Sequence, residues 1–180
     1  MIPKESISNR LNITDFFDNI SDIEYVIMRL DLDFPNYKYS DDIDILCSEP
    51  EKFIKNILNI VKEKYKDFKV NVNYGSGGVT HFHVDLFYRS ETIDDFRFDI
   101  ISNLSDFYKN LKIPNNYESV ILKNKNKHIK YNVSIPNISH ELSLRYMEYI
   151  SKIKKKPKKI KHLEYIQKFP DISFTKFELK

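Results

Sequence analysis

Cysteine, tryptophan and glycine are scarce in this chain of 180 residues, which has one cysteine, no tryptophan and three glycines. Cys47 has no second cysteine to pair with, so an intramolecular disulfide and a metal cluster of several thiolates are both excluded. All three glycines fall within residues 75–78. A phosphate-binding glycine loop would open a helix, whereas this segment joins two strand patterns, so we expect a hairpin turn there.

Long hydrophobic runs are missing as well. Residues 1–6 lack the apolar core of a signal peptide, and no apolar segment approaches the length that is needed to span a membrane. These absences predict a cytoplasmic protein that does not have the membrane as a partner.

Charge of one sign is not in large excess, because 29 Lys and Arg residues stand against 26 Asp and Glu residues. The formal net charge of +3 is too small to indicate nucleic acid by itself, so a nucleic-acid partner is allowed but not favoured. Residues 152–161 are nevertheless strongly basic. This run has three interpretations: a solvated helix face, a contact with phosphate or nucleic acid, and a contact with a membrane surface.

Strand patterns dominate the chain before its last quarter. Alternating or β-branched residues predict strands at residues 24–30, 42–47, 70–74, 79–88, 96–101, 119–123 and 129–135. Two helices are also predicted there: a short one at residues 14–20, and a longer one that Ser48 caps, with Pro50 in its first turn. The longer helix has a core-facing stripe, namely Phe53, Ile54, Ile57, Leu58, Val61 and Tyr65.

The C-terminal part has helical spacing instead. Ser139 is expected to cap a helix that runs to about residue 156, with Leu142, Tyr146, Tyr149, Ile150 and Ile153 as its inner stripe. Pro157 interrupts the pattern, and a further helix follows. The predicted fold class is α+β: a mixed β-sheet flanked by helices, with residues 1–138 as the core and residues 139–180 as a helical C-terminal extension packed on it.

The segment Asp42-Ile43-Asp44-Ile45 carries the strongest chemical signal. Side chains alternate along a strand, so Asp42 and Asp44 face one side and the isoleucines face the other. Two carboxylates at that separation repel each other, and a divalent cation is the usual remedy. The alternation therefore favours a metal-dependent phosphoryl-transfer site, although a polar strand entrance would show the same pattern.

A second pattern lies on residues 79–88. His81, His83 and Asp85 alternate and share one face, and imidazole with carboxylate suits zinc or iron. A His/Asp metallohydrolase is therefore an alternative function. A single strand is a stiff scaffold for three consecutive ligands, however, so the histidines are also interpreted as flanking a magnesium site or as ordinary sheet residues.

The order of strand, acidic loop, acidic pair, capped helix and further acidic strand resembles the DNA-polymerase-β-type nucleotidyltransferase superfamily. The resemblance is carried by Ser40-Asp41-Asp42-Ile43-Asp44-Ile45-Leu46 and by Val84-Asp85-Leu86, which matches the third carboxylate on a neighbouring strand. It covers residues 20–105 in its motifs. With Tyr25-Val26-Ile27-Met28-Arg29 ahead of the acidic pair, the chain is more specifically similar to small stand-alone members that are found with bacterial polysaccharide genes.

This resemblance implies a Mg²⁺- or Mn²⁺-dependent nucleotidyltransferase. Such an enzyme moves a nucleoside monophosphate from a nucleoside triphosphate, such as ATP, to a small-molecule or sugar-linked acceptor. Asp42 and Asp44 become shared metal ligands, and Asp85 becomes the ligand of the catalytic ion and the base for the acceptor hydroxyl. Asp99 competes with Asp85 for that role, and Asp85 is preferred because it lies mid-strand between apolar neighbours.

Nucleotide contacts are expected from Arg29, Ser40 and Arg145. The superfamily places Gly-Ser at the end of its first strand, where this chain reads Met28-Arg29-Leu30. The guanidinium of Arg29 either substitutes by holding phosphate oxygens or pairs with Asp31 or Asp33. If it only pairs, a catalytically inactive nucleotidyltransferase-like binding or toxin–antitoxin protein becomes the alternative. Arg145 likewise either reaches a nucleotide phosphate or pairs with Glu141 or Glu148.

Overall fold

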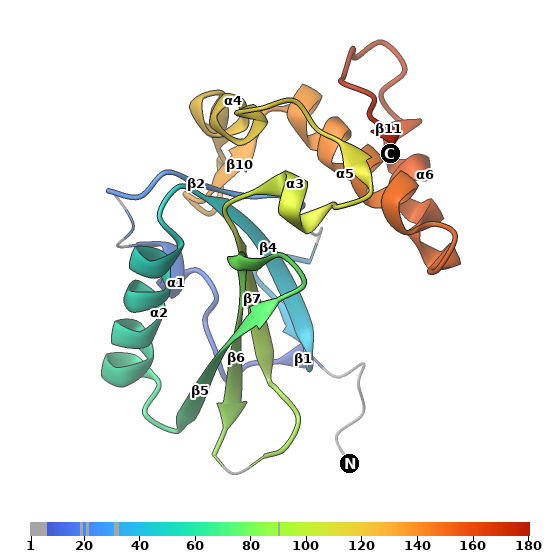
Figure 1. The fold of residues 1–180 in the computed structure, drawn as a ribbon. Helices are drawn as coiled ribbons and strands as arrows, with labels where there is room; N and C mark the ends of the chain where they lie inside the picture. The colour runs from blue at the N-terminus through green and yellow to red at the C-terminus, as the bar shows by residue number, and fades with distance from the viewer. Residues whose placement is uncertain (1–6, 19, 21, 31–32, 90) are drawn as a thin grey trace.

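The computed structural model describes residues 7–18, 20, 22–30, 33–89 and 91–180. Within these residues, a five-stranded mixed sheet with the order β2-β4-β7-β6-β5 forms the centre of the fold (Figure 1). Its strands are β2 (Tyr25–Ile27), β4 (Asp41–Cys47), β5 (Phe68–Gly75), β6 (Gly78–Tyr88) and β7 (Phe96–Ile101). β4 and β7 are parallel, and the other neighbours are antiparallel. The predicted α+β class with a mixed sheet, flanking helices and a helical C-terminus is confirmed.

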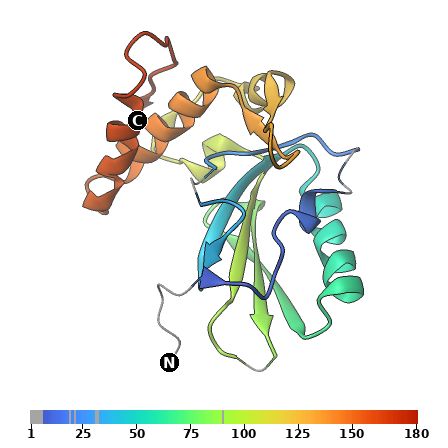
Figure 2. The ribbon, with the colours of Figure 1, turned by 180° about the vertical axis from the view of Figure 1, so that it is seen from behind.

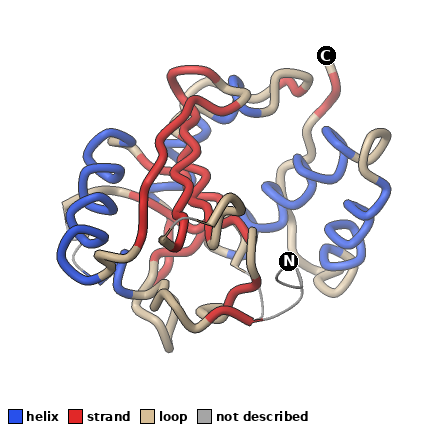
Figure 3. Tube along the Cα trace, turned by 90° about the horizontal axis from the view of Figure 1, so that it is seen from below, coloured by secondary structure: helices blue, strands red, loops and turns tan. Residues whose placement is uncertain are grey.

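Two helices near the N-terminus cover one face of this sheet. They are α1 (Asp15–Asp18) and α2 (Pro50–Lys64), and Figure 3 shows helices on both sides of the strands. Phe16 of α1 packs against Phe98 of β7 with ring centroids 5.0 Å apart, and Phe53 of α2 is fully buried. Burying these rings and the aliphatic residues of the strands removes a large apolar area from water, which is the main stabilising contribution to the fold.

The C-terminal helices lie on the other side of the sheet (Figure 2). They are α3 (Leu104–Phe107), α4 (Tyr117–Lys123), α5 (Ile138–Lys152), the 3₁₀ helix η1 (Pro157–Lys159) and α6 (Ile160–Ile166). A second apolar cluster joins Leu144 and Met147 of α5 to Val26, Leu46 and Ile101 on the sheet. The C-terminal helices are thus anchored at one end of the sheet, and the remaining part of that face is polar.

Three short ladders complete the fold. β1 (Ile7–Ser8) pairs with β3 (Tyr37–Lys38), and β8 (Leu111–Lys112) pairs with β11 (Glu178–Leu179). β9 (Lys125–Lys127) pairs with β10 (Ser134–Pro136). β3 lies in the acidic loop that precedes Asp42 and Asp44, where no strand was predicted, and it forms because it pairs with β1, which is distant in sequence. None of the helices that the structure describes is long and apolar enough to cross a bilayer.

Several local predictions are confirmed and others are wrong. β7 has the predicted bounds, the glycines form the turn between β5 and β6, and α6 follows the interruption at Pro157. The strand that was predicted at residues 119–123 is wrong, because this segment belongs to α4. Tyr117 and Ile121 lie one helical turn apart and bury into the second apolar cluster, and this packing outweighs the strand propensity of the β-branched residues.

Helix capping also differs from the prediction. Glu49 occupies the N-cap position of α2, where Ser48 was expected, and the Ser48 hydroxyl donates to the carbonyl of Glu24 instead. Asn137 rather than Ser139 caps α5, and its side chain accepts the amide of His140 at 3.0 Å. The hydroxyl of Ser139 donates to the carbonyl of Ser173 at 2.8 Å, so both expected caps are engaged by segments distant in sequence, which local spacing does not reveal.

The buried stripe of α5 is the clearest correction among the helices. Leu142 is buried as predicted, but Tyr146, Tyr149, Ile150 and Ile153 are only partly covered. The buried side instead carries Ser143, Leu144, Arg145, Met147 and Glu148. α5 is packed between the second apolar cluster and α6, so its polar side is covered as well.

Candidate metal centre

The strand registers bring polar side chains together on one face of the central sheet. Residues directly opposite each other on neighbouring strands lie on the same face. The pairs are Asp42 with Arg97 and Asp44 with Asp99 between β4 and β7, and His83 with Asp99 and Asp85 with Arg97 between β6 and β7. Two residues further along each strand, Leu46, Ile101 and His81 continue this face toward the second apolar cluster.

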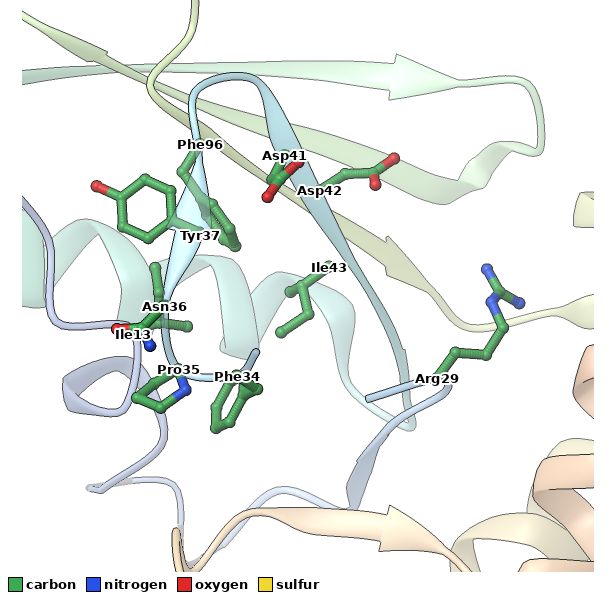
Figure 4. A pocket seen from close by; sticks show the side chains of 10 residues that line it. All are labelled: Ile13, Arg29, Phe34, Pro35, Asn36, Tyr37, Asp41, Asp42, Ile43 and Phe96. Carbon is green, nitrogen blue, oxygen red and sulfur yellow. The ribbon is translucent and has the colours of Figure 1, made fainter. Parts of the chain in front are cut away.

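The alternation along β4 is visible in Figure 4. The side chain of Asp42 points to one side of the strand together with Arg29, and Ile43 points to the other side, toward Phe34. Ile43 lines a small hollow of about 40 Å³, which has room for little more than a few water molecules. The apolar side of β4 is therefore core, and its polar side is available for chemistry.

A cleft of about 310 Å³ lies between this polar face and the C-terminal helices, which is within the range of small-molecule sites. Its sheet side contains the carboxylate cluster, which we define as Asp42, Asp44 and Asp99, together with His81, His83 and Arg97. Its helix side contains the basic wall, which we define as Arg145, Lys152, Lys156, Lys159 and Lys161. The cleft thus combines groups that bind cations with groups that bind anions.

Around Asp99, burial and the neighbouring carboxylates outweigh the compensating charge of Arg97. Burial, together with the negative charges of Asp44 and Asp42, raises the pKa of Asp99 to about 8. The pKa of Asp42 is also raised, by partial loss of solvation in the cleft and by Asp44. The Oδ1 atom of Asp99 is buried without a hydrogen-bond partner. Carboxylates that repel one another and include an unpartnered oxygen match the donor set of a divalent cation.

The structure brings Asp99, and not the preferred Asp85, next to the acidic pair. Strand β7 lies between β4 and β6, so Asp99 is on the neighbouring strand of the acidic pair and Asp85 is one strand further away. The Oδ1 atom of Asp85 accepts a 2.5 Å hydrogen bond from Nε of Arg97. Asp85 is 5% exposed and does not line the cleft. Both aspartates lie mid-strand between apolar residues, so only the strand order distinguishes them.

The two histidines of β6 join Asp99 rather than Asp85. Among the described residues, His81, His83 and Asp99 each offer a ligand atom, and these atoms lie within 4.8 Å of one another. The Nε2 atom of His83 is 3.6 Å from Oδ1 of Asp99. Burial and the neighbouring His83 lower the pKa of His81 to about 4, and burial and Arg97 lower that of His83. Both imidazoles are therefore neutral at pH 7, which is the state that binds metals.

Arg29 contacts the carboxylate cluster directly. Its guanidinium forms an ion pair with Oδ2 of Asp44 and donates to the hydroxyl of Tyr108 at 2.9 Å. Although burial disfavours the charge, Asp44 raises the pKa of Arg29 well above its ordinary value. Asp33, one of the expected partners, is exposed and does not form this pair, and Asp31 lies outside the described residues. Arg29 lines the cleft but is engaged by Asp44.

Glu148 is fully buried and forms ion pairs with two lysines of the basic wall. Its carboxylate accepts from Tyr108 at 3.1 Å and pairs with Lys152 at 3.0 Å and with Lys159. Burial opposes ionisation, but Arg29, Lys152 and Lys159 lower the pKa of Glu148 strongly. A continuous chain of contacts therefore leads from Asp44 through Arg29, Tyr108 and Glu148 to the lysines.

Arg145 lines the cleft, whereas Ser40 does not. Arg145 pairs with Glu141 at 2.8 Å and stacks over the ring of Tyr165 at 3.8 Å from the centroid, and it also lines the cleft. Of the two expected acidic partners of Arg145, Glu141 forms the ion pair, and Glu148 pairs with lysines instead. Ser40 lies in the turn before β4 with a positive φ of 61°, and its hydroxyl donates to the carbonyl of Asp94 at 3.2 Å. It is not among the residues that line the cleft.

Residues of the cleft and its support that the sequence did not indicate include Arg97, Tyr108 and His162, and Glu148 was considered only as a partner of Arg145. His162 is buried on α6, with neither ring nitrogen hydrogen-bonded, and burial and Arg29 lower its pKa to about 3. Glu148 occurs among lysines and tyrosines at ordinary helical spacing, so no local signal distinguishes it. Each gains its role from the packing of α5 and α6 over the sheet.

Comparisons of this chain with protein-family models, with curated proteins and with solved structures found no match.

Proposed function

We propose that this protein is a metal-dependent nucleotidyltransferase, which transfers a nucleoside monophosphate from a nucleoside triphosphate to a hydroxyl of a small-molecule or sugar-linked acceptor. The observation that carries the proposal is the register of β4 and β7, which aligns Asp44 with Asp99 and leaves Asp42 beside them at the bottom of one cleft. Three carboxylates on neighbouring strands can hold the metal ions of a phosphoryl-transfer site, and the basic wall opposite them can bind the phosphates of the substrate.

The carboxylate cluster fits Mg²⁺ or Mn²⁺, because these hard cations prefer oxygen ligands and the buried Oδ1 atom of Asp99 has no hydrogen-bond partner. A bound dication would supply charge neutralisation at the reacting phosphate and at the leaving pyrophosphate. The residues that would hold it are Asp42, Asp44 and Asp99, and in this proposal Asp99 replaces Asp85. Binding there requires Asp44 to exchange its ion pair with Arg29 for the cation.

In the proposed reaction, the sheet side of the cleft acts on the reacting groups and the helix side binds the phosphates that leave. The acceptor oxygen forms a bond to the α-phosphorus, the bond from that phosphorus to the bridging oxygen breaks, and pyrophosphate leaves. Asp99 would receive the hydroxyl proton in its ionised form, which a bound cation favours. The basic wall holds the β- and γ-phosphates, and Arg29, once released from Asp44, is close enough to the cluster to bind a phosphate oxygen.

A nucleotidyltransferase-like protein without catalysis is the second candidate. The ion pair between Arg29 and Asp44 favours it, because an arginine that permanently neutralises this carboxylate would prevent metal binding. The two candidates differ in whether the cation displaces Arg29.

Nucleotide titration with and without metal tests the proposal. The purified chain is titrated with each of the four ribonucleoside triphosphates in a calorimeter, with Mg²⁺, with Mn²⁺ and with chelator, and pyrophosphate release is assayed in parallel. We expect metal-dependent binding of at least one triphosphate, and Asp44→Asn should lose turnover while remaining folded. Absence of binding at millimolar nucleotide with metal present would favour the non-catalytic candidate. Full activity of Asp44→Asn would refute the assignment of the site.

A further inference from the structure

We propose that His81, His83 and Asp99 form a binding site for a transition-metal dication such as Zn²⁺, Co²⁺ or Fe²⁺. Its imidazole ligands distinguish it from the magnesium site proposed above, which has oxygen ligands only. The inference does not depend on nucleotidyl transfer. It rests on three ligand atoms within 4.8 Å of one another, supplied by neighbouring strands at the base of a cleft.

Strand geometry places the ligands and holds them. His81 and His83 are two residues apart on β6, so both face the cleft side of the sheet, and Asp99 lies opposite His83 on β7. The ring of His81 packs edge-on against Phe107 at 4.9 Å and against His83 at 4.7 Å between centroids. Because the third ligand comes from the neighbouring strand, no single strand has to supply three consecutive ligands.

Two buried atoms without partners point independently to a missing ligand. Nε2 of His81 and Oδ1 of Asp99 have no hydrogen bond, and the two residues are only 2% and 8% exposed. Leaving such groups buried and unpaired costs free energy, so most buried polar atoms in proteins are satisfied. A cation that both atoms coordinate would remove this penalty.

The distance between His83 and Asp99 requires only a small adjustment, and the ligand atom of His81, within 4.8 Å of the other two, has to move closer. Nε2 of His83 and Oδ1 of Asp99 are 3.6 Å apart, whereas two ligands of a tetrahedral zinc ion are roughly 3.3–3.4 Å apart. Ligation through Nε2 of His81 would place the imidazole proton on Nδ1 and end the contact that the Gly77 amide makes with Nδ1. That contact is 3.4 Å long, which is weak for a hydrogen bond.

The ligand set determines the class of ion. Imidazole nitrogen favours zinc, cobalt, iron and copper over magnesium and calcium, which prefer oxygen alone. Three protein ligands that border a cleft leave a coordination position for water or substrate, as catalytic zinc sites do. Asp99 belongs to both this group and the carboxylate cluster, so an ion here would lie next to Asp44.

Cobalt binding to the metal-stripped chain tests the inference. Co²⁺ should bind with one equivalent and produce visible d–d absorption, pulsed electron paramagnetic resonance should detect coupling to imidazole nitrogen, and Zn²⁺ should displace the ion whereas millimolar Mg²⁺ should not. His83→Gln should weaken Co²⁺ binding by at least about 100-fold, since loss of even an outer partner of a metal ligand costs roughly 10–100-fold in affinity. Asp99→Asn should have a comparable effect.

Matched variants separate this site from the proposed active site. His128→Gln removes a histidine outside the cleft and Asp85→Asn removes the carboxylate held by Arg97, so both should bind Co²⁺ like the parent. Asp42→Asn should retain Co²⁺ but lose nucleotidyl transfer. Unaltered Co²⁺ affinity in a folded His83→Gln variant, or bound Co²⁺ without nitrogen coupling, would overturn the inference and leave the proposed function intact. Co²⁺ bound through nitrogen in a chain that binds no nucleotide would support it without that function.

Discussion

At the scale of single residues, identical side chains differ in role because their neighbours differ. Asp85 and Asp99 both lie mid-strand on one face of the sheet. Arg97 satisfies Asp85, whereas Asp99 is surrounded by Asp44, by Asp42 and by an imidazole that burial keeps neutral. Ionising Asp99 is therefore costly in the folded protein, which raises its pKa, and strongly shifted pKa values are typical of functional positions.

This difference predicts a pH dependence of stability. The pKa of Asp99 is raised to about 8, so between the ordinary carboxyl value of 3.8 and about 8 the folded protein binds a proton that the unfolded chain releases. The stabilisation is complete below the ordinary pKa and is lost as the pH rises through about 8. In metal-free buffer, we expect Asp99 to lower the free energy of unfolding by at least about 1.4 kcal/mol between pH 6 and pH 8.5, because each pKa unit corresponds to that amount. This contribution is the difference between the parent and Asp99→Asn, because His81 and His162, whose pKa values are lowered to about 4 and about 3, change the stability in the opposite direction over the same range.

Urea denaturation at the two pH values measures this change. Asp99→Asn cannot ionise and should show a much smaller decrease, while Asp85→Asn should keep the decrease of the parent. Equal pH dependence in the parent and in Asp99→Asn would show that other groups cause it. Adding Mn²⁺ should restore stability at pH 8.5 in the parent, since a cation stabilises the ionised carboxylate.

At the scale of secondary-structure elements, helical spacing identifies α2 but not the exact edge of its buried side. Ile57 and Leu58 were both placed on the core-facing stripe. The structure buries Ile57 completely and leaves Leu58 41% exposed, and Ile60 is buried in addition. The buried side of α2 therefore excludes Leu58, which the predicted stripe included, and includes Ile60, which the stripe left out.

Alanine substitutions in α2 test this orientation. Ile57→Ala should lower the free energy of unfolding by about 2–5 kcal/mol, because it creates a cavity in the first apolar cluster. Leu58→Ala should change it by no more than about 0.5 kcal/mol, as surface substitutions usually do. Chemical denaturation of both variants measures the contrast, and similar losses would contradict the orientation of α2.

At the scale of the whole molecule, the C-terminal helices turn a polar sheet face into a cleft. The basic run contributes to that cleft from α5, η1 and α6, although a solvated helix face was the first interpretation of the run. Lys152 and Lys159 are held by Glu148, and Lys156 and Lys161 are exposed at the cleft. The opposite side of the sheet is covered by α2, which carries its own exposed lysines.

Lysine pairs from the two sides therefore form a matched experiment. Replacing Lys156 and Lys161 with alanine should weaken triphosphate or pyrophosphate binding roughly tenfold in low salt, the sum of two partly screened charge contacts of less than about 1 kcal/mol each. Replacing Lys55 and Lys62 of α2 removes the same charge and should leave affinity unchanged. Calorimetry at two salt concentrations distinguishes the cases, and equal losses would indicate only a long-range effect of net charge.

The sequence alone determined the features that depend on neighbours in the chain. The acidic pair of β4, the glycine hairpin and the α+β class follow from alternation, from backbone freedom at glycine and from the change to helical spacing near residue 139. Tertiary structure alone decided which third carboxylate joins Asp42 and Asp44, that Arg29 pairs with Asp44, and that Glu148 is buried among lysines. The physical reason is that strand order and helix docking arise from contacts between distant segments, and a local pattern such as Val84-Asp85-Leu86 or Phe98-Asp99-Ile100 is the same whichever strand lies beside it.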